Sequence, residues 1–229
     1  MLPDLRQFAE TTLLAVAALL PIVNPLGGAP IYLAKTVDLT PAAHDELAKR
    51  VAVNSFLLLI ASALIGAYVL DFFGLSIPVV QLGGGLVVSS IAWTMLNQPD
   101  SVVPMQRDAA RAISPEDLKR RAFYPLTMPL TVGPGSISVA ITLGANQSHV
   151  ELRPFIVNLA GHLAGILLVT LTVFVCYRYA DTILRKLGDV GTVVLERLAA
   201  FILLCIGVQI VWNGVSALVG TLHVAPRAG

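Results

Sequence analysis

Two proline-rich segments contain the polar groups that are best placed to bind a small solute in an otherwise apolar sequence. They run from Pro21 to Pro30 and from Pro125 to Pro134, and both follow the pattern P-x3-P-L-x3-P. Proline has no backbone N–H and clashes with the preceding turn, so neither segment can form one smooth helix. A helix that restarts after Pro30 or Pro134 would offer N–H groups to a carboxylate. Carbonyls before each break would suit an ammonium group or a cation, so we expect a binding site there.

The candidate site residues are polar, proline and glycine residues of the two breaks, together with one asparagine from each neighbouring apolar segment. They are Asn24, Pro25, Gly27, Gly28, Thr127, Pro129, Thr131, Gly133, Gly135, Ser136, Asn54 and Asn158. Two simpler interpretations stay open. A proline kink can shape helix packing without binding a ligand, and polar side chains in apolar helices often bond one helix to another.

A serine and a histidine suggest a second kind of chemistry. Gly135-Ser136 could form a nucleophile elbow with His162 as the base, because a serine hydroxyl needs a neighbouring imidazole to attack a substrate. His162 lies four residues after Asn158, so it could also bind a solute, carry protons or simply pack. No oxyanion-hole donors can be identified from the sequence. We therefore expect no catalytic residues and no enzyme activity.

The elements that must position these residues are six long apolar windows. Each contains 20 to 29 residues without Asp, Glu, Lys or Arg, and a membrane-spanning helix needs ~20 predominantly apolar residues. The windows are Thr11–Ala34, Val51–Leu70, Phe72–Pro99, Ala122–Val150, Pro154–Tyr177 and Leu198–Thr221. The sequence predicts an all-α integral membrane protein with six transmembrane helices, the first and fourth broken, and the lipid bilayer as its main partner.

The basic residues predict the orientation of these helices. Eleven Lys and Arg residues lie on the first, third and fifth connections, and three lie on the side of the termini. The first set is Lys35, Lys49, Arg50, Arg107, Arg111, Lys119, Arg120, Arg121, Arg178, Arg185 and Lys186, and the second is Arg6, Arg153 and Arg227. Cytoplasmic loops carry the excess of basic residues. We therefore expect both termini on the outer, periplasmic side.

The two proline-rich segments belong to an internal duplication. Pro125 follows Pro21 by 104 residues, and the same offset places Asn54 on Asn158, while the third and sixth windows align at an offset of 116. A duplicated unit of three spans must insert its second copy upside down, as in many secondary transporters. We predict a first repeat at 1–97, a cytoplasmic connecting loop at 98–121 and a second, inverted repeat at 122–229.

Composition excludes several kinds of site and partner. The formal net charge of +1 provides no basic face for nucleic acid. Cys176 and Cys205 both lie in apolar windows, so the sequence predicts neither a metal site nor a disulfide framework. No Asp or Glu lies in any window, so a small neutral or zwitterionic solute fits best. No cofactor is expected, and a coupling ion, Na⁺ or H⁺, stays open.

The glycine run in the third window predicts a close helix contact. Gly83, Gly84 and Gly85 leave room for a neighbouring helix. That neighbour could belong to the same chain or to a second copy, so a homo-oligomer stays open.

Motifs spread over nearly the whole chain indicate a family. They are Asn24-Pro25-Leu26, Phe73-Gly74-Leu75-Ser76-Ile77-Pro78, Gly83-Gly84, Pro125-Leu126-Thr127-Met128-Pro129, Gly133-Pro134-Gly135-Ser136-Ile137, Gly207-Val208-Gln209 and Asn213-Gly214. With these motifs the sequence resembles the MarC family of bacterial inner-membrane proteins, within a wider group of LysE-like transporters. The resemblance implies a six-span inner-membrane protein, and some relatives are described as transporters of small neutral amino acids such as glycine and alanine.

The function expected is therefore secondary transport of small neutral amino acids or similar solutes, with the site at the paired breaks near the membrane midplane. A passive channel is the alternative, because Asn24-Pro25 is similar to the paired Asn-Pro motifs of water channels. The second copy reads Met128-Pro129 and lacks the asparagine. The intramembrane serine hydrolase with Ser136 and His162 is a third hypothesis.

Overall fold

The computed structural model describes residues 2–36, 38–97, 114–145 and 152–223. The first half contains α1 (Leu2–Val23), α2 (Pro25–Ala34), α3 (Pro41–Phe72) and α4 (Ile77–Asn97). The second half contains α5 (Pro115–Arg121), the π-helical segment η1 (Ala122–Thr131), α6 (Pro134–Ala145), α7 (Leu152–Arg178) and α8 (Ala180–His223). All the secondary-structure elements in these ranges are helices, which confirms the prediction of an all-α protein.

Local sequence signals set several of the helix ends. The Thr40 side chain caps α3 by accepting the N–H of Ala43, and the helix begins at a proline, which fits the first helical position. Ser114 caps α5 in the same way through the N–H of Asp117. Inside α8 the regular helix is interrupted at Gly188, whose φ of +70° is a conformation that glycine adopts at little cost.

Five helical stretches of the described chain are long and apolar enough to cross a membrane, and one bent pair adds a sixth. One stretch is formed by α1 and α2 together. The other four are α3, α4, α7 and the Val190–Gly220 part of α8. The bent pair joins Pro115–Thr131 to Pro134–Ala145 at an angle of 73°. The prediction of a multi-span membrane protein is confirmed, and a total of six requires counting the bent pair as one span.

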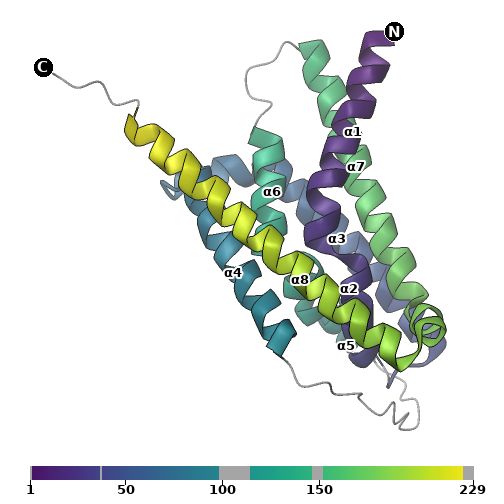
Figure 1. Cartoon of the computed structure of the whole chain (residues 1–229). Helices are drawn as coiled ribbons and strands as arrows, with labels where there is room; N and C mark the ends of the chain where they lie inside the picture. The colour runs from purple at the N-terminus through teal and green to yellow at the C-terminus, as the bar shows by residue number, and fades with distance from the viewer. Residues whose placement is uncertain (1, 37, 98–113, 146–151, 224–229) are drawn as a thin grey trace, which may run out of the picture.

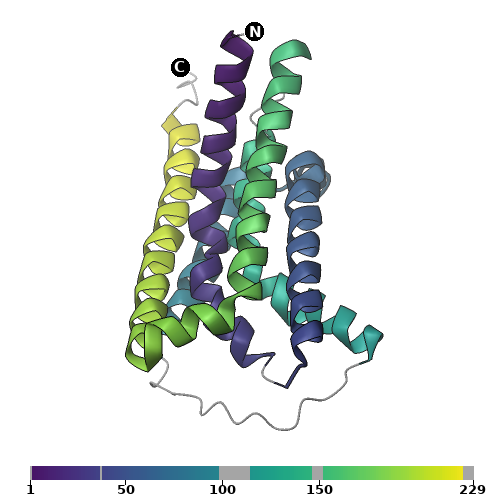
Figure 2. The same cartoon turned by 90° about the vertical axis from the view of Figure 1, so that its right-hand side faces the viewer.

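The long helices run side by side, and α1 begins at the end of the molecule where α8 finishes (Figures 1 and 2). The opposite end holds the C-terminus of α2, the start of α3, α5 and the turn between α7 and α8. We call it the basic end, because it carries Lys35, Lys49, Arg50, Lys119, Arg120, Arg121, Arg178, Arg185 and Lys186. Arg107, Arg111 and Arg227 lie outside the described residues. That the basic end faces the cytoplasm stays a prediction.

The last candidate span contains the predicted charge-free window and extends beyond its start. The candidate span runs from Val190 to Gly220, whereas the window begins at Leu198. Arg197 lies in the additional segment, where its guanidinium donates to the main-chain carbonyls of Met95 and Leu96 at the C-terminal end of α4. A helix C-terminus carries a partial negative charge that favours a cation. This contact allows a charged residue in the first turns of an apolar helix.

The predicted connecting loop at 98–121 lies largely outside the described residues. Its described part, from Ser114 onward, contains the short helix α5. The division of the chain into repeats at 1–97 and 122–229 stays a prediction.

Glycines allow α4 to pack closely against α8. A Cβ added to Gly85 would lie 2.7 Å from the main-chain nitrogen of Val211 and 2.8 Å from the carbonyl oxygen of Gly207. A Cβ on Gly84 would lie 3.1 Å from the carbonyl oxygen of Pro134, whereas one on Gly83 would meet nothing within 4 Å. The close helix contact predicted for this glycine run is therefore made within the chain, by two of its three glycines.

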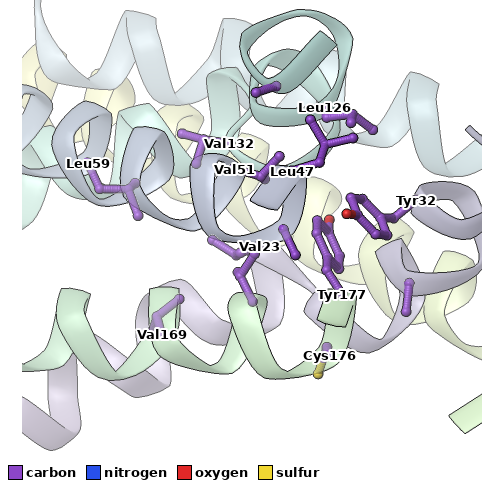
Figure 3. Close-up of a cluster of buried hydrophobic side chains, with 14 of the residues drawn as sticks. Val23, Tyr32, Leu47, Val51, Leu59, Leu126, Val132, Val169, Cys176 and Tyr177 are labelled. Atoms are coloured by element: carbon purple, nitrogen blue, oxygen red, sulfur yellow. The ribbon is translucent and has the colours of Figure 1, made fainter. Parts of the chain in front are cut away.

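The buried core lies where the two breaks meet α3 and α7. Figure 3 labels ten of its side chains: Val23, Tyr32, Leu47, Val51, Leu59, Leu126, Val132, Val169, Cys176 and Tyr177. Both cysteines are free, Cys176 buried and Cys205 exposed. Large apolar side chains such as Trp93, Phe201 and Trp212 are exposed on the outer surface, as expected for contact with lipid.

The α4–α8 contact predicts opposite effects for two neighbouring glycines. Gly85→Ala should lower the melting temperature of the detergent-purified protein, because the new methyl group meets main-chain atoms of α8. Gly83→Ala should leave it unchanged or raise it, since alanine is favoured over glycine in a helix by about 0.5–1 kcal/mol. Thermal unfolding of both variants measures the difference. Equal melting temperatures for the two variants would contradict this packing.

Candidate functional site at the two helix breaks

The first break consists of one residue, Asn24, which lies between α1 and α2 and caps the N-terminus of α2. Asn24 has φ +45° and ψ +60°, a left-handed conformation that asparagine tolerates better than most residues. Its side-chain Oδ1 accepts the N–H of Gly27 at 3.2 Å, and its own N–H donates to the carbonyl of Leu20 at 2.9 Å. Asn24 thus supplies hydrogen bonds around Pro25, which has no N–H to donate.

The restart of the first helix corrects the sequence prediction. We expected the second half-helix to begin after Pro30, but α2 begins at Pro25 and contains Pro30 in its interior. Proline is well suited to the first helical position because its missing N–H has no intrahelical partner there. In the second segment α6 begins at Pro134, as expected.

The second break is longer and contains two irregular residues. Tyr124 and Met128 have extended backbone angles inside η1, and each precedes a proline joined by a cis peptide bond, Pro125 and Pro129. The segment Tyr-Pro-Leu-Thr-Met-Pro-Leu-Thr, 124–131, repeats a four-residue unit. This short repeat is a sequence signal that could have predicted the length of the break, and it places a threonine two residues after each cis proline.

The two threonines of this repeat bond to the main chain. The hydroxyl of Thr127 donates to the carbonyl of Ala122, and that of Thr131 donates to the carbonyl of Leu126, both at 2.7 Å. Both threonine side chains are buried. These bonds span five residues instead of the four of a regular helix. The threonines stabilise the shape of the break and do not line the pocket described below.

One buried tyrosine contacts both breaks. The Tyr177 hydroxyl lies 2.9 Å from the hydroxyl of Thr131 in the second break. A Cβ on Gly28, in the first break, would lie 2.6 Å from the same Tyr177 oxygen, so only glycine leaves space for it. The Tyr177 ring also stacks on Tyr32 with 4.5 Å between ring centroids (Figure 3). Tyr32 in turn donates to the carbonyl of His44 at 2.8 Å.

The two breaks line a common pocket of about 260 Å³. The end of α1, the first break and α2 with its C-cap contribute Ile22, Val23, Asn24, Gly27, Gly28, Ile31 and Lys35, and the second break contributes Pro125, Leu126, Pro129 and Leu130. Ile91 and Met95 of α4 and Leu203 of α8 complete the wall. Four predicted site residues, Asn24, Gly27, Gly28 and Pro129, therefore meet around one cavity. That they bind a solute stays a prediction.

Six other predicted residues of the breaks are placed outside this pocket. They are Pro25, Thr127, Thr131, Gly133, Gly135 and Ser136. Pro25 starts α2, and the threonines bond to the main chain. Gly135 and Ser136 are buried in the first turn of α6, and an added Cβ on Gly135 would clash with Val88 of α4. In this structure these residues serve packing rather than the wall of the pocket.

The two asparagines of the neighbouring spans also lie away from the pocket. Asn158 on α7 accepts hydrogen bonds from Gln7 at 2.9 Å and from Thr11 at 3.1 Å, so it joins α7 to α1. Asn54 is half-buried on α3. For Asn158 the structure supports the interpretation of helix-to-helix bonding.

His162 lines a different cavity, of about 490 Å³, between α3, α6 and α7. Asp71 and Tyr68 of α3 line the same cavity. Within the described ranges no hydrogen bond joins His162 to Ser136.

Sequence reasoning missed Tyr177, Tyr32 and Lys35. The two tyrosines place polar hydroxyls in apolar windows, and a buried hydroxyl needs a hydrogen-bond partner. That signal could have marked them as contacts between the breaks. In the sequence analysis Lys35 served only to predict the orientation in the membrane. Its place at the pocket depends on where α2 begins, and the sequence did not predict that start.

Removing the Tyr177 hydroxyl tests the link between the breaks. Tyr177→Phe should lower the free energy of unfolding by about 1 kcal/mol, the usual value of one hydrogen bond. Thr131→Val should lower the free energy of unfolding less in the Tyr177→Phe protein than in the wild type, because the bond between the two hydroxyls is already absent. Tyr179→Phe, at an exposed position between α7 and α8, is the matched control and should leave the free energy of unfolding unchanged. Additive effects of the first two changes would contradict a direct bond.

Comparison with known proteins places the chain in a family. The profile described as MarC family integral membrane protein matches residues 9–219. Proteins named UPF0056 inner membrane protein MarC from Salmonella typhimurium and Citrobacter koseri are 30% identical, and the one from Escherichia coli is 29% identical. Each comparison covers 92% of this chain and 96% of the relative. No solved structure matches. This chain belongs to the MarC family of integral membrane proteins.

Proposed function

We propose that this protein is a secondary transporter of small neutral solutes, in particular neutral amino acids, through the pocket between the two helix breaks. The observation that carries the proposal is that both breaks line one cavity, Asn24 and Gly28 on one side and Pro129 on the other. Transporters of this type commonly bind their solutes between discontinuous helices near the membrane midplane. A concave, mostly apolar cavity with few polar groups is also typical of small-molecule sites.

The packing of the helices supports the inverted repeat on which this proposal depends. α1 and α2 pack against α7, η1 and α6 pack against α3, and α4 packs against α8. Exchanging the two repeats would map α1 with α2 onto η1 with α6, α3 onto α7 and α4 onto α8. This exchange converts the contacts with α7 into the contacts with α3 and the reverse, and it converts the α4–α8 contact into itself. A pseudo-two-fold axis requires this relation.

The choice of a neutral solute follows from the resemblance described above and from the wall of the pocket. No Asp or Glu of the described part of the chain lines it. Glu196 lies in the span of α8 but not at the pocket. We propose Na⁺ or H⁺ as the coupling ion, no cofactor, and no hydrolytic role for Ser136.

Flux into proteoliposomes tests the proposed function. Reconstituted protein should take up labelled alanine or leucine with a rate that saturates and that an unlabelled amino acid reduces. An imposed Na⁺ or H⁺ gradient should increase this uptake. A rate that rises without saturation would favour the passive channel. No uptake above empty liposomes, with or without a gradient, would refute transport.

Filling the pocket should block transport. Leu203→Trp adds bulk to the pocket wall and should lower the uptake rate by about tenfold, because overfilling a packed site costs about 1–3 kcal/mol. Ile202→Trp, on the outer surface of the same helix, is the matched control and should retain uptake. The proposal fails if both variants transport at the wild-type rate while retaining the wild-type melting temperature.

The proposed orientation places both termini in the periplasm. In a Cys205→Ala background, Arg6→Cys should react with a membrane-impermeant thiol reagent added to intact spheroplasts. Arg120→Cys, at the basic end, should react only after the membrane is permeabilised. The opposite labelling pattern would reverse the orientation.

A further inference from the structure

One face of α2 runs along the pocket from the break to the basic end. Asn24, Gly28, Ile31 and Lys35 line the pocket and follow one another at spacings of three or four residues, which places them on one side of a helix. From Asn24 to Lys35 this face is about 16 Å long at 1.5 Å per residue. The pocket lies along this face of α2, with Asn24 near one end of the face and Lys35 near the other, and we call it the groove.

The polar side chains at both ends of this groove are hydrogen-bond donors. The Asn24 oxygen already accepts the N–H of Gly27, and its amide nitrogen has no hydrogen-bond partner among the described residues. Lys35 presents an ammonium group and caps the C-terminal end of α2. Among the described residues, no carboxylate lines the groove. A solute that matches it must bring an acceptor, preferably an anionic one.

The walls between these donors are apolar. Eight of the fourteen lining residues are aliphatic or methionine: Ile22, Val23, Ile31, Ile91, Met95, Leu126, Leu130 and Leu203. A cavity of about 150 Å³ with such a lining accepts a benzene ring, and this one measures about 260 Å³. The groove therefore has room for an apolar group much larger than the hydrogen or methyl side chain of glycine or alanine.

We propose that the face of α2 from Asn24 to Lys35 is a carboxylate-selective path for amphipathic solutes. The Asn24 amide nitrogen donates to the carboxylate at the break, and the Lys35 ammonium group attracts and receives it at the basic end. The apolar walls hold an aliphatic side chain between them. This inference rests on the proposed transport function and extends its solutes from neutral amino acids to any carboxylate on an apolar body of leucine size, with or without an amino group.

A set of related solutes tests this class. Leucine and 4-methylpentanoate share the carboxylate and the side chain, 3-methylbutylamine lacks the carboxylate, and glycine lacks the side chain. The first two should raise the melting temperature of the purified protein and compete for leucine uptake, since a ligand that binds only the folded state stabilises it. The amine should do neither, and glycine should compete more weakly than leucine.

Two substitutions separate the donors from the structural roles of the same residues. Asn24→Asp retains a capping oxygen for the N–H of Gly27 but replaces the amide donor by an acceptor, so it should fold and lose the leucine-induced shift. Lys35→Gln should lower leucine uptake from the basic end by about tenfold at low salt, while Lys35→Arg should retain it. Lys119→Gln removes a charge from the same end without touching the groove and serves as the control.

The outcomes distinguish this inference from the proposed function. Saturable uptake in which the amine competes as well as leucine would overturn the solute class and leave transport intact. Unchanged uptake in Lys35→Gln together with an unchanged shift in Asn24→Asp would overturn the path along α2. An absence of wild-type uptake for every solute would refute both proposals.

Discussion

The proline residues inside the apolar segments are the constraint on which the rest of the structure depends. A main-chain N–H or carbonyl group that loses its partner at a break cannot turn to water inside a membrane, so the protein must supply another partner or bury the group against itself. The two breaks do so with side chains. Asn24 caps the restarted helix in the first break, and the hydroxyls of Thr127 and Thr131 reach back to carbonyls in the second. Both breaks are therefore held in a defined shape.

The two breaks contact the same buried side chain in the core. Tyr177 fits against Gly28 of the first break and bonds to Thr131 of the second. On another side of the same breaks the chain leaves an open groove lined by both. Thr127, Thr131 and Tyr177 stabilise the breaks without lining the groove, whereas Asn24 and Gly28 do both.

Much of the fold could be predicted because membrane-spanning helices follow directly from long runs without charge. The break at Asn24 and the restart at Pro134 were also within reach, because proline acts locally. What the sequence could not provide was the direction in which each polar residue points. Asn158 and Thr131 looked like equally good site residues, but tertiary packing turned one toward α1 and the other toward Tyr177. The contact of Arg197 with α4 could not be predicted either, because its partner Met95 lies 102 positions away in the sequence.

The central claim is that both breaks form one solute site, and solute protection of introduced cysteines tests it most directly. In a Cys205→Ala background, Ile31→Cys on α2 and Leu130→Cys in the second break would each be treated with a small thiol reagent. A transported solute should slow both reactions over the same concentration range, since both positions line the same pocket. Protection of one position alone, or of neither at a concentration that saturates uptake, would contradict the shared site.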